Sequence, residues 1–359
     1  MIDKSPMQPY LFGLKHSNRD FTKHKSWGKN QFNSSFPAAL ACYMGSKNIN
    51  PIYLKVNNDL TIDRDEIPIS RVLGLDYNSP HLFFAFERDY LPYQNLVIGT
   101  LPRVDLVTMD TEKDLCLQGL EIKLTALPDH TTCNLPEDRY SCELVVRPPT
   151  IIYLSISFAK TYQNDRENLL AFLQPVCSKI KDWTDPKIIL ALLPELIETI
   201  DIISKARVSE QFPIVMQPIW KTEGKSAKLC DRCLDIIMWS NFAFTRLFIE
   251  AAKSEINHSR ISRHKRCVAW FAKMLYDFAT GGKINYEETI DEMSFNTKND
   301  KAFALSGMRT YQYMKSPILT NPRIRKNEIK NIILGGGELL LSPERRFDAV
   351  ILNTPGLFD

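Results

Sequence analysis

Hydrophobic and polar positions alternate with a different period in successive parts of the chain, and the change divides it into predicted helices and strands. After the polar residues 33–35, apolar positions at helical spacing predict a helix through FPAALACYM. A polar connection with several prolines, containing IDRDEIPISR and DYNSPH, follows it. From residue 96 to residue 158, turn residues separate short runs rich in Val, Ile and Leu, which is typical of strands. The predicted strands are NLVIGTLPRVDLVTM, GLEIKLTAL, CELVVR and TIIYLSISF.

The rest of the chain has mostly helical patterns. Asp185 and Pro186 form an N-cap and first-turn pair, and the helix that they begin contains Pro194, which we expect to kink or divide it. FPIVMQPIW predicts a strand, and the glycines at 335–337 predict a turn between two final strands. Two long segments have helical apolar periodicity and predict helices: LCDRCLDIIMWSNFAFTRLFIEAAKSEI and RHKRCVAWFAKMLYDFA.

Together these elements predict an α/β (α+β) fold, in which helices flank a central mixed β-sheet and a mainly helical lobe forms the C-terminal part. The change of pattern along the chain predicts three regions. These are a helical or mixed N-terminal region over 1–95, a core containing the sheet over 96–206, and a mainly helical region over 207–359.

The composition is that of an ordinary globular protein, with 44% hydrophobic and 24% charged residues, and it excludes long disorder. Because no apolar run is long enough to cross a bilayer and no signal peptide is visible, we expect a cytoplasmic protein with no membrane partner. The eight cysteines are then expected to be reduced thiols. Cys230 and Cys233 have the spacing of a zinc-ligand pair, but His258 follows too far along a predicted helix for a zinc finger. Whether this pair binds a metal stays open.

Charged residues interrupt two of the predicted strands. Asp105 lies in LPRVDLVTM, and Glu121 and Lys123 lie in GLEIKLTAL, all among apolar neighbours. The strand period of two puts Glu121 and Lys123 on one face, and a neighbouring strand brings Asp105 alongside. A buried charge without a partner is costly. Either these side chains face solvent as an ordinary Glu–Lys pair, or they are gathered for chemistry.

The chemistry that fits this set is phosphodiester cleavage with a divalent metal. Mg²⁺ prefers oxygen ligands and usually takes one or two carboxylates from the protein. Asp105 and Glu121 supply two, and the carbonyl of Ile122 is a further oxygen. Lys123 beside them would orient the attacking water or offset the charge of the transition state. No competing catalytic arrangement is visible in the sequence.

The D…E-x-K arrangement, preceded by Pro102, resembles the PD-(D/E)xK nuclease superfamily. Pro102 and Asp105 are separated by two residues here, which is a looser form of the motif. The likeness sharpens to the HindVP-type type II restriction endonucleases, because of segments that span most of the chain. These segments are NQFNSSFPAALACYM, GTLPRVDLV, GLEIKLTALPDHTTC and ELVVRPPTIIYLSIS.

The resemblance implies a restriction-endonuclease-like core with Asp105, Glu121 and Lys123 as catalytic residues, and Asp105 and Glu121 as ligands of Mg²⁺. It also implies double-stranded DNA as substrate, cut at a palindrome of the form GRCGYC by a homodimer. Two-fold symmetry of the DNA site matches two-fold symmetry of the protein. A restriction enzyme also implies a cognate DNA methyltransferase in the same system. Two alternatives stay open: a structure-selective repair or recombination nuclease with the same motif, and a non-catalytic DNA-binding protein.

Further polar residues are candidates for supporting roles. Glu143 is a possible additional acid, or an exposed carboxylate on an edge strand, and Thr125 continues the face of Glu121 and Lys123. Net charge is only +3, so DNA binding must rest on the distribution of charge. Basic residues are dense in two stretches near 253–283 and 309–330, which are either solvated faces or phosphate contacts. The predicted DNA-binding residues are Arg260, Arg263, Lys265, Arg266, Arg309, Arg323 and Arg325.

Overall fold

A computed structural model describes residues 14, 16–18, 29–128, 144–222, 229–255, 260–295, 303–305 and 322–328 of the chain. The strands are β1 Ile52–Val56, β2 Ile62–Glu66, β3 Leu82–Asp89, β4 Arg103–Asp110, β5 Leu115–Ile122, β6 Thr125–Pro128, β7 Leu144–Val146, β8 Pro213–Thr222, β9 Leu229–Ser240, β10 Phe303–Leu305 and β11 Ile324–Arg325. The helices are α1 Lys29–Ser46, α2 Ile69–Leu73, α4 Pro148–Thr161, α5 Arg166–Cys177, α6 Pro186–Ala206, α7 Asn241–Lys253, α8 Arg263–Gly281 and α9 Tyr286–Glu292. Short 3₁₀ turns are η3 Leu91–Leu96, η5 Val208–Glu210 and η6 Lys326–Glu328.

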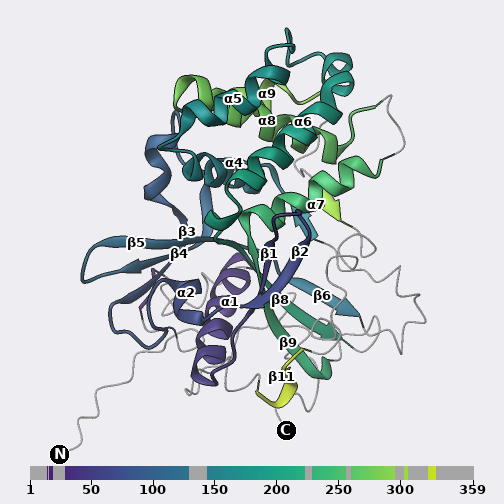
Figure 1. The fold of residues 1–359 in the computed structure, drawn as a ribbon. Coiled ribbons are helices and arrows are strands. Elements are labelled where there is room, and N and C mark those ends of the chain that lie inside the picture. The colour runs from purple at the N-terminus through teal and green to yellow at the C-terminus, as the bar shows by residue number, and fades with distance from the viewer. Residues whose placement is uncertain are drawn as a thin grey trace, which may run out of the picture.

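One mixed sheet organises the part of the chain that the structure describes. Its strand order is β2-β1-β9-β8-β5-β4-β3, with β6 beside β8 and β11 beside β9. The strands β3, β4 and β5 form an antiparallel meander, and β5 continues parallel to β8. Helices lie on both faces of the sheet, α1 and α2 on one and α4 to α9 on the other (Figure 1). The predicted α/β class, with a central mixed sheet flanked by helices, is therefore confirmed.

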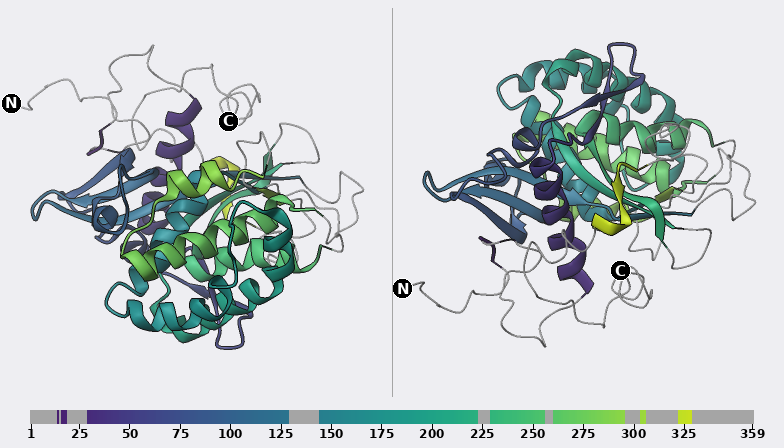
Figure 2. Two further views of the ribbon diagram at one scale, coloured as in Figure 1. Left: turned by 90° about the horizontal axis from the view of Figure 1, so that it is seen from above. Right: turned by 90° about the horizontal axis from the view of Figure 1, so that it is seen from below.

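The connection from β5 to β8 carries the helices α4, α5 and α6 over one face of the sheet. Parallel neighbours need such a crossover, because a hairpin cannot join them. Figure 2 shows the helices of this layer from above, on the left, and the helix α1 on the opposite face of the sheet from below, on the right. All three predicted regions of the chain contribute strands to the sheet, since β8 and β9 lie beyond residue 206.

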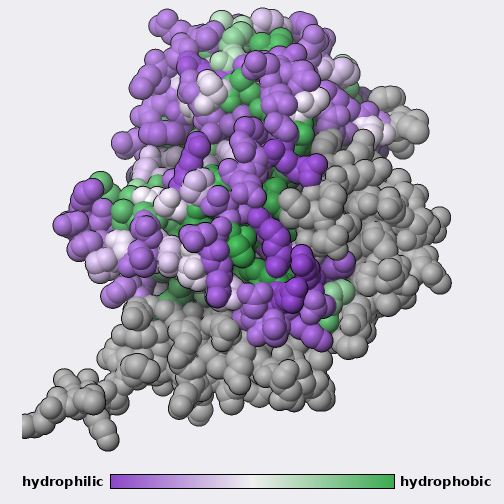
Figure 3. All heavy atoms as spheres, turned by 60° about the horizontal axis from the view of Figure 1, so that its bottom comes forward, coloured by the Kyte–Doolittle hydropathy of each residue, from purple (hydrophilic) through white to green (hydrophobic). Residues whose placement is uncertain are grey.

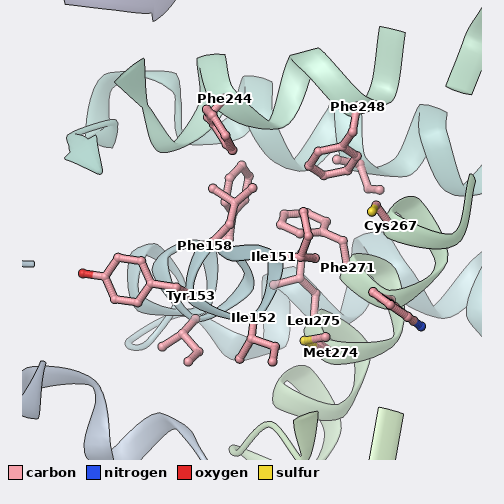
Figure 4. Close-up of a cluster of buried hydrophobic side chains, with 14 of the residues drawn as sticks. Ile151, Ile152, Tyr153, Phe158, Phe244, Phe248, Cys267, Phe271, Met274 and Leu275 are labelled. Atoms are coloured by element: carbon pink, nitrogen blue, oxygen red, sulfur yellow. The ribbon is translucent and has the colours of Figure 1, made fainter. Parts of the chain in front are cut away.

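Each face of the sheet has its own hydrophobic core, because alternate strand residues point to opposite faces. Val107 packs in the core under α4 to α8, whereas Leu106 packs in the core under α1 and α2. The helical side is dense in aromatic rings: Phe158 of α4 meets Phe271 of α8 with ring centroids 4.9 Å apart (Figure 4). These contacts hold α4 firmly between the sheet and α8.

One predicted strand, TIIYLSISF, is a helix. Its residues, Thr150 to Phe158, belong to α4, and all of them are buried. A helix buried on every side has no polar face and so lacks the periodicity that identifies helices. Pro148 and Pro149 in the first turn were the available signal, since proline is favoured at the start of a helix.

One predicted helix, beginning at LCDRCLDIIMWS, is instead the strand β9 followed by the helix α7. From Cys233 onward β9 is fully buried, because it lies inside the sheet with helices on both faces. The boundary has a recognisable signal: the Ser240 side chain accepts a hydrogen bond from the backbone N–H of Ala243 and caps α7.

Other expectations are met more closely. The helices predicted at FPAALACYM, after Asp185 and at RHKRCVAWFAKMLYDFA are α1, α6 and α8, and FPIVMQPIW lies in β8. The helix α6 is not divided at Pro194 but continues to Ala206. The polar connection after α1 contains the strand β2 and the short helix α2. The final strands expected on either side of residues 335–337 lie outside the described residues.

Among the described residues, few large hydrophobic side chains are exposed. On the face drawn in Figure 3, hydrophilic residues cover most of the described surface and hydrophobic ones form small patches between them. Within the described residues, no helix combines the length and apolar character needed to span a membrane.

Candidate active site

The pairing of β4 with β5 brings Asp105 and Glu121 side by side. Leu106 faces Leu120 in this antiparallel pair, so Asp105 and Glu121 are the next residues along it. The Oδ2 atom of Asp105 accepts a hydrogen bond from the backbone N–H of Ile122 at 2.7 Å. Lys123 Nζ lies 2.7 Å from Glu121 Oε2 and 3.9 Å from Asp105 Oδ2. The structure thus brings the three predicted catalytic side chains together.

Burial separates this group from an ordinary surface pair. The side chains of Glu121 and Lys123 are only 6% and 15% exposed, whereas that of Asp105 is 39% exposed. Thr150 of α4 donates a hydrogen bond from Oγ1 to Glu121 Oε2 at 3.1 Å. A carboxylate buried and paired in this way differs from the solvent-facing Glu–Lys pair considered as the alternative. The opening toward solvent is on the Asp105 side.

The charges of the site act on one another. Burial and the neighbouring charge of Glu121 raise the pKa of Asp105 to about 6, although Lys123 and the Ile122 N–H oppose this. Burial alone would lower the pKa of Lys123, but the charges of Glu121 and Asp105 outweigh it and the pKa is raised. Lys123 therefore remains an ammonium group, and the two acids leave an excess of negative charge.

The donor set fits a hard divalent cation. Two carboxylates on adjacent strands are the number that Mg²⁺ usually takes from a protein, with water and phosphate oxygens completing its shell. A nearby cation would also relieve the repulsion that raises the pKa of Asp105. Over the described part of the chain, no group of three or more His, Cys, Asp and Glu residues is arranged to hold a metal. Thus Cys230 and Cys233, both in β9, are not part of such a group there.

A third carboxylate, missed from the sequence, lies in the same row. Glu87 of β3 stands between the pairs Phe86–Leu106 and Arg88–Val104, so it is directly across from Asp105. Its φ of 51° is in the left-handed region, which is unusual for a residue other than glycine. Its charge adds to the rise in the pKa of Asp105. No sequence signal marks it, since the proximity depends on strand register.

The start of α4 forms another wall of the site. Arg147 precedes the helix in extended conformation and is exposed, and its positive charge acts to lower the pKa of Lys123. Thr150 is in the first turn of the same helix and was also missed, because its segment was predicted as a strand. Of the predicted accessory residues, Glu143 and the side chain of Thr125 lie outside the described part of the structure.

The predicted DNA-binding residues differ in how far their side chains are exposed to solvent. Arg260, Arg263 and Arg325 are exposed. Lys265 and Arg266 are each only 2% exposed, with Lys265 Nζ 3.9 Å from Glu255 and the Arg266 guanidinium over the Trp270 ring.

Lys265 and Arg266 begin a continuous run of buried residues in α8 that ends at Ala272. Their burial does not support the predicted phosphate contacts. Arg323 is half-buried and donates two hydrogen bonds to the buried carboxylate of Asp235 at 2.7 and 2.8 Å. It therefore anchors the segment before β11 to β9. Arg309 lies outside the described residues.

Comparison with known proteins assigns the chain to a family. The model of the HindVP restriction endonuclease matches residues 27–358. The chain belongs to this family. It is 48% identical to the type II restriction enzyme HgiDI of Herpetosiphon aurantiacus, with 98% of each chain covered. It is 43% identical to the probable type II restriction enzyme HindVP of Haemophilus influenzae, covering 98% of this chain and 96% of the relative. No solved structure matches the chain.

Membership of the HindVP restriction endonuclease family confirms the resemblance seen in the motif segments and makes the protein a type II restriction endonuclease. The family match covers the sheet, the site formed by β4 and β5, and the helices α4 to α9.

Proposed function

We propose that the protein cuts both strands of double-stranded DNA at a short palindrome by Mg²⁺-dependent hydrolysis, and that Asp105, Glu121 and Lys123 carry the reaction. The observation that supports this most is the buried Glu121 carboxylate, held 2.7 Å from Lys123 and beside Asp105. Buried charges are costly, and a buried carboxylate beside a second acid and a lysine is an arrangement that active sites commonly use.

The roles follow from burial and charge. Asp105 and Glu121 would hold Mg²⁺, together with the carbonyl of Ile122. When bound, the ion supplies neutralisation of a phosphate oxygen and activation of water. Lys123 stays protonated because its pKa is raised, so it acts as a hydrogen-bond donor and cation rather than as a base. It would orient the attacking water and stabilise charge that develops on the phosphate. Products would carry 5′-phosphate and 3′-hydroxyl ends.

The substrate and assembly follow from the family. The HindVP-type resemblance implies recognition of GRCGYC, a palindrome whose two halves require two active sites related by two-fold symmetry. We therefore propose a homodimer. In a cell, such an enzyme needs a cognate DNA methyltransferase that modifies the same sequence, because unmodified chromosomal sites would be cut.

The test is a digest of a long, fully sequenced, unmethylated DNA. With Mg²⁺ we expect discrete fragments whose ends map to one palindrome, and no fragments with EDTA. Lys123→Ala should reduce cleavage by about 100-fold or more, the loss typical of a donor that stabilises transition-state charge. Lys113→Ala is the matched control, since this exposed lysine lies in the β4–β5 turn and pairs with Asp110 at 3.8 Å.

The other outcomes separate the alternatives. A metal-dependent smear, or cutting only of branched DNA, would indicate a structure-selective nuclease. Full cleavage by Lys123→Ala and by Glu121→Gln would move the active site elsewhere. Binding without cleavage under any condition would leave a DNA-binding protein.

A further inference from the structure

Two hydroxyl groups on one face of α4 contact the strand that carries Glu121. Thr150 Oγ1 donates to Glu121 Oε2 at 3.1 Å, and Tyr153 Oη donates to the carbonyl of Gly119 at 2.9 Å. Thr150 and Tyr153 are three residues apart, which places them on the same side of a helix. Gly119 and Glu121 are two residues apart, which places them on the same face of a strand. The helix α4 therefore contacts the strand β5 through two hydrogen bonds, one from each hydroxyl group.

We propose that Thr150 is a positioning residue for DNA cleavage, and that its hydroxyl fixes the Glu121 carboxylate in the orientation needed to bind the metal. This inference rests on the proposed function of Glu121 as a metal ligand. Thr150 itself touches neither the metal nor the DNA; it acts through Glu121. Groups that hydrogen-bond a metal ligand in this way set the orientation of the ligand.

The contact with Lys123 alone would not fix Glu121. Lys123 reaches Glu121 Oε2 along a flexible chain, and its own position depends on the carboxylates that attract it. Thr150 is β-branched and lies in the first turn of a helix, so its side chain has few rotamers. Both bonds end on Oε2, so Thr150 and Lys123 hold the same oxygen of the carboxylate. The hydroxyl also compensates part of the cost of burying this charge.

The helix that presents Thr150 is itself held in place. Tyr153 is directed away from the aromatic cluster in which Phe158 and Phe271 pack (Figure 4), and it reaches the backbone of β5 instead. A side chain on Gly119 would place its Cβ only 2.2 Å from Tyr153 Oη, so the close approach of α4 requires glycine there. The contact between Tyr153 and Gly119 therefore helps to hold α4, and with it Thr150, against β5.

The experiment compares Thr150→Val, which keeps the shape and removes the hydroxyl, with Thr150→Ser, which keeps the hydroxyl. Ser155→Ala is the control, because Ser155 is a buried hydroxyl of the same helix that bonds only within it, to Ile151 at 2.9 Å. Each variant is measured as the full-length protein. The readouts are Mg²⁺ affinity by calorimetry, the single-turnover cleavage rate across a Mg²⁺ titration, DNA affinity in Ca²⁺, and melting temperature.

We expect Thr150→Val to weaken Mg²⁺ binding and to slow cleavage by about 10- to 100-fold, the loss typical when a partner of a metal ligand is removed. The DNA affinity of Thr150→Val should be unchanged. The Mg²⁺ affinity and cleavage rate of Thr150→Ser should be within a few-fold of the wild-type values. Ser155→Ala should have the wild-type affinity and rate. If Thr150→Val does not fold, Thr150→Ala replaces it, since it adds no atoms.

Three results would overturn the proposal. The first is that Thr150→Val, which lacks the hydroxyl, keeps the wild-type Mg²⁺ affinity and cleavage rate. The second is a loss in which Thr150→Ser behaves like Thr150→Val. The third is a loss that Ser155→Ala shares. Glu121→Gln distinguishes these from failure of the proposed function: if Glu121→Gln is inactive while Thr150→Val is normal, only the role of Thr150 is wrong. If Glu121→Gln cleaves normally, the active-site assignment itself is wrong.

Discussion

At the scale of single residues, the proposed metal ion and a proton would compete for the carboxylate of Asp105. Burial, Glu121 and Glu87 all favour the neutral form of Asp105, and only Lys123 and a backbone N–H oppose them. The carboxyl therefore takes up a proton at a higher pH than an exposed aspartate does. Mg²⁺ needs the ionised carboxylate, so binding of the ion and protonation of Asp105 exclude each other.

We expect the affinity for Mg²⁺ to fall as the pH drops through about 6, where Asp105 becomes protonated. A carboxyl with an ordinary pKa would keep its affinity down to about pH 4. Calorimetric titrations between pH 8 and pH 5 measure this. Glu87→Gln should move the midpoint to lower pH, because it removes one of the charges that oppose ionisation of Asp105. Constant affinity over the whole range would contradict the prediction.

The raised pKa of Asp105 also has a consequence for stability. The folded protein binds this proton more tightly than the unfolded chain does. The contribution of the carboxyl to stability is therefore complete below its ordinary pKa and is lost as the pH rises through about 6. We expect Asp105→Asn to raise the melting temperature of the metal-free protein at pH 7 to 8, and to leave it nearly unchanged near pH 4.

Asp182→Asn provides a comparison of opposite sign. Hydrogen bonds from Thr184 lower the pKa of Asp182, so this exposed carboxylate stabilises the protein above its ordinary pKa. Its replacement should lower the melting temperature at pH 7 slightly. If Asp105→Asn and Asp182→Asn changed the melting temperature by the same amount, the effect at Asp105 would come from the loss of one negative charge and not from the surroundings of that carboxyl.

At the scale of elements, the sequence predicts those whose local pattern has a clear limit or a polar face. The segments of β4 and β5 are rich in Val, Ile and Leu and are bounded by turn residues, and α8 has a polar face, so their patterns are visible. The elements buried on all sides, α4 and β9, show only continuous apolar runs that are ambiguous between helix and strand.

The same limit applies to the candidate site. Asp105, Glu121 and Lys123 could be predicted, because the strand period places two of them on one face and their residue types define the chemistry. Glu87 and Thr150 could not, since their proximity depends on the register of β3 with β4 and on α4 being a helix. Lys265 and Arg266 look like surface charges in the sequence, yet both are buried in the first turns of α8.

The contact between α4 and β5 gives a prediction for this pair of elements. Gly119→Ala would bring a Cβ to 2.2 Å from Tyr153 Oη and 2.8 Å from the Tyr90 ring. Overpacking of this kind costs about 1–3 kcal/mol, so we expect a lower melting temperature and, because α4 moves, slower cleavage. Gly281→Ala is the control, since nothing lies within 4 Å of the added Cβ. A Gly119→Ala protein as stable and active as the wild type would contradict the close contact.

At the scale of the whole molecule, DNA binding must come from exposed basic groups near the site, because the net charge is only +3. Arg260 and Arg263 are exposed at the start of α8. The helix α8 contacts β10, and β10 pairs with β7 immediately before Arg147. This chain of contacts connects α8, the helix that these arginines precede and begin, to the segment that leads into α4.

We expect Arg260→Ala with Arg263→Ala to weaken DNA binding and to reduce its salt dependence. Each lost phosphate contact should lower the slope of log affinity against log salt by about 0.9. Titrations in Ca²⁺ at several salt concentrations measure the slope. Lys179→Ala is the control, since Lys179 pairs with Glu195 on the helical layer. An unchanged slope in the double variant would place the phosphate contacts elsewhere.

The proposed palindromic target makes the largest-scale prediction: each subunit of the proposed homodimer is expected to cut one strand. Sedimentation should then give twice the mass of the 41.3 kDa chain. Heterodimers of the wild type with Lys123→Ala, purified through two different tags, would contain one working site. On a supercoiled plasmid with a single target we expect them to produce nicked circles, whereas the wild type produces linear DNA and the Lys123→Ala homodimer produces neither.

The nicked product is informative because it shows whether each subunit cuts only one of the two DNA strands. If one subunit cut both strands in turn, the heterodimer would still linearise the plasmid, at about half the rate. If the protein acted as a monomer, mixing with the variant would dilute activity without accumulating nicks. Persistent nicking at the same palindrome therefore requires two sites of the Asp105, Glu121 and Lys123 kind, each acting on its own strand.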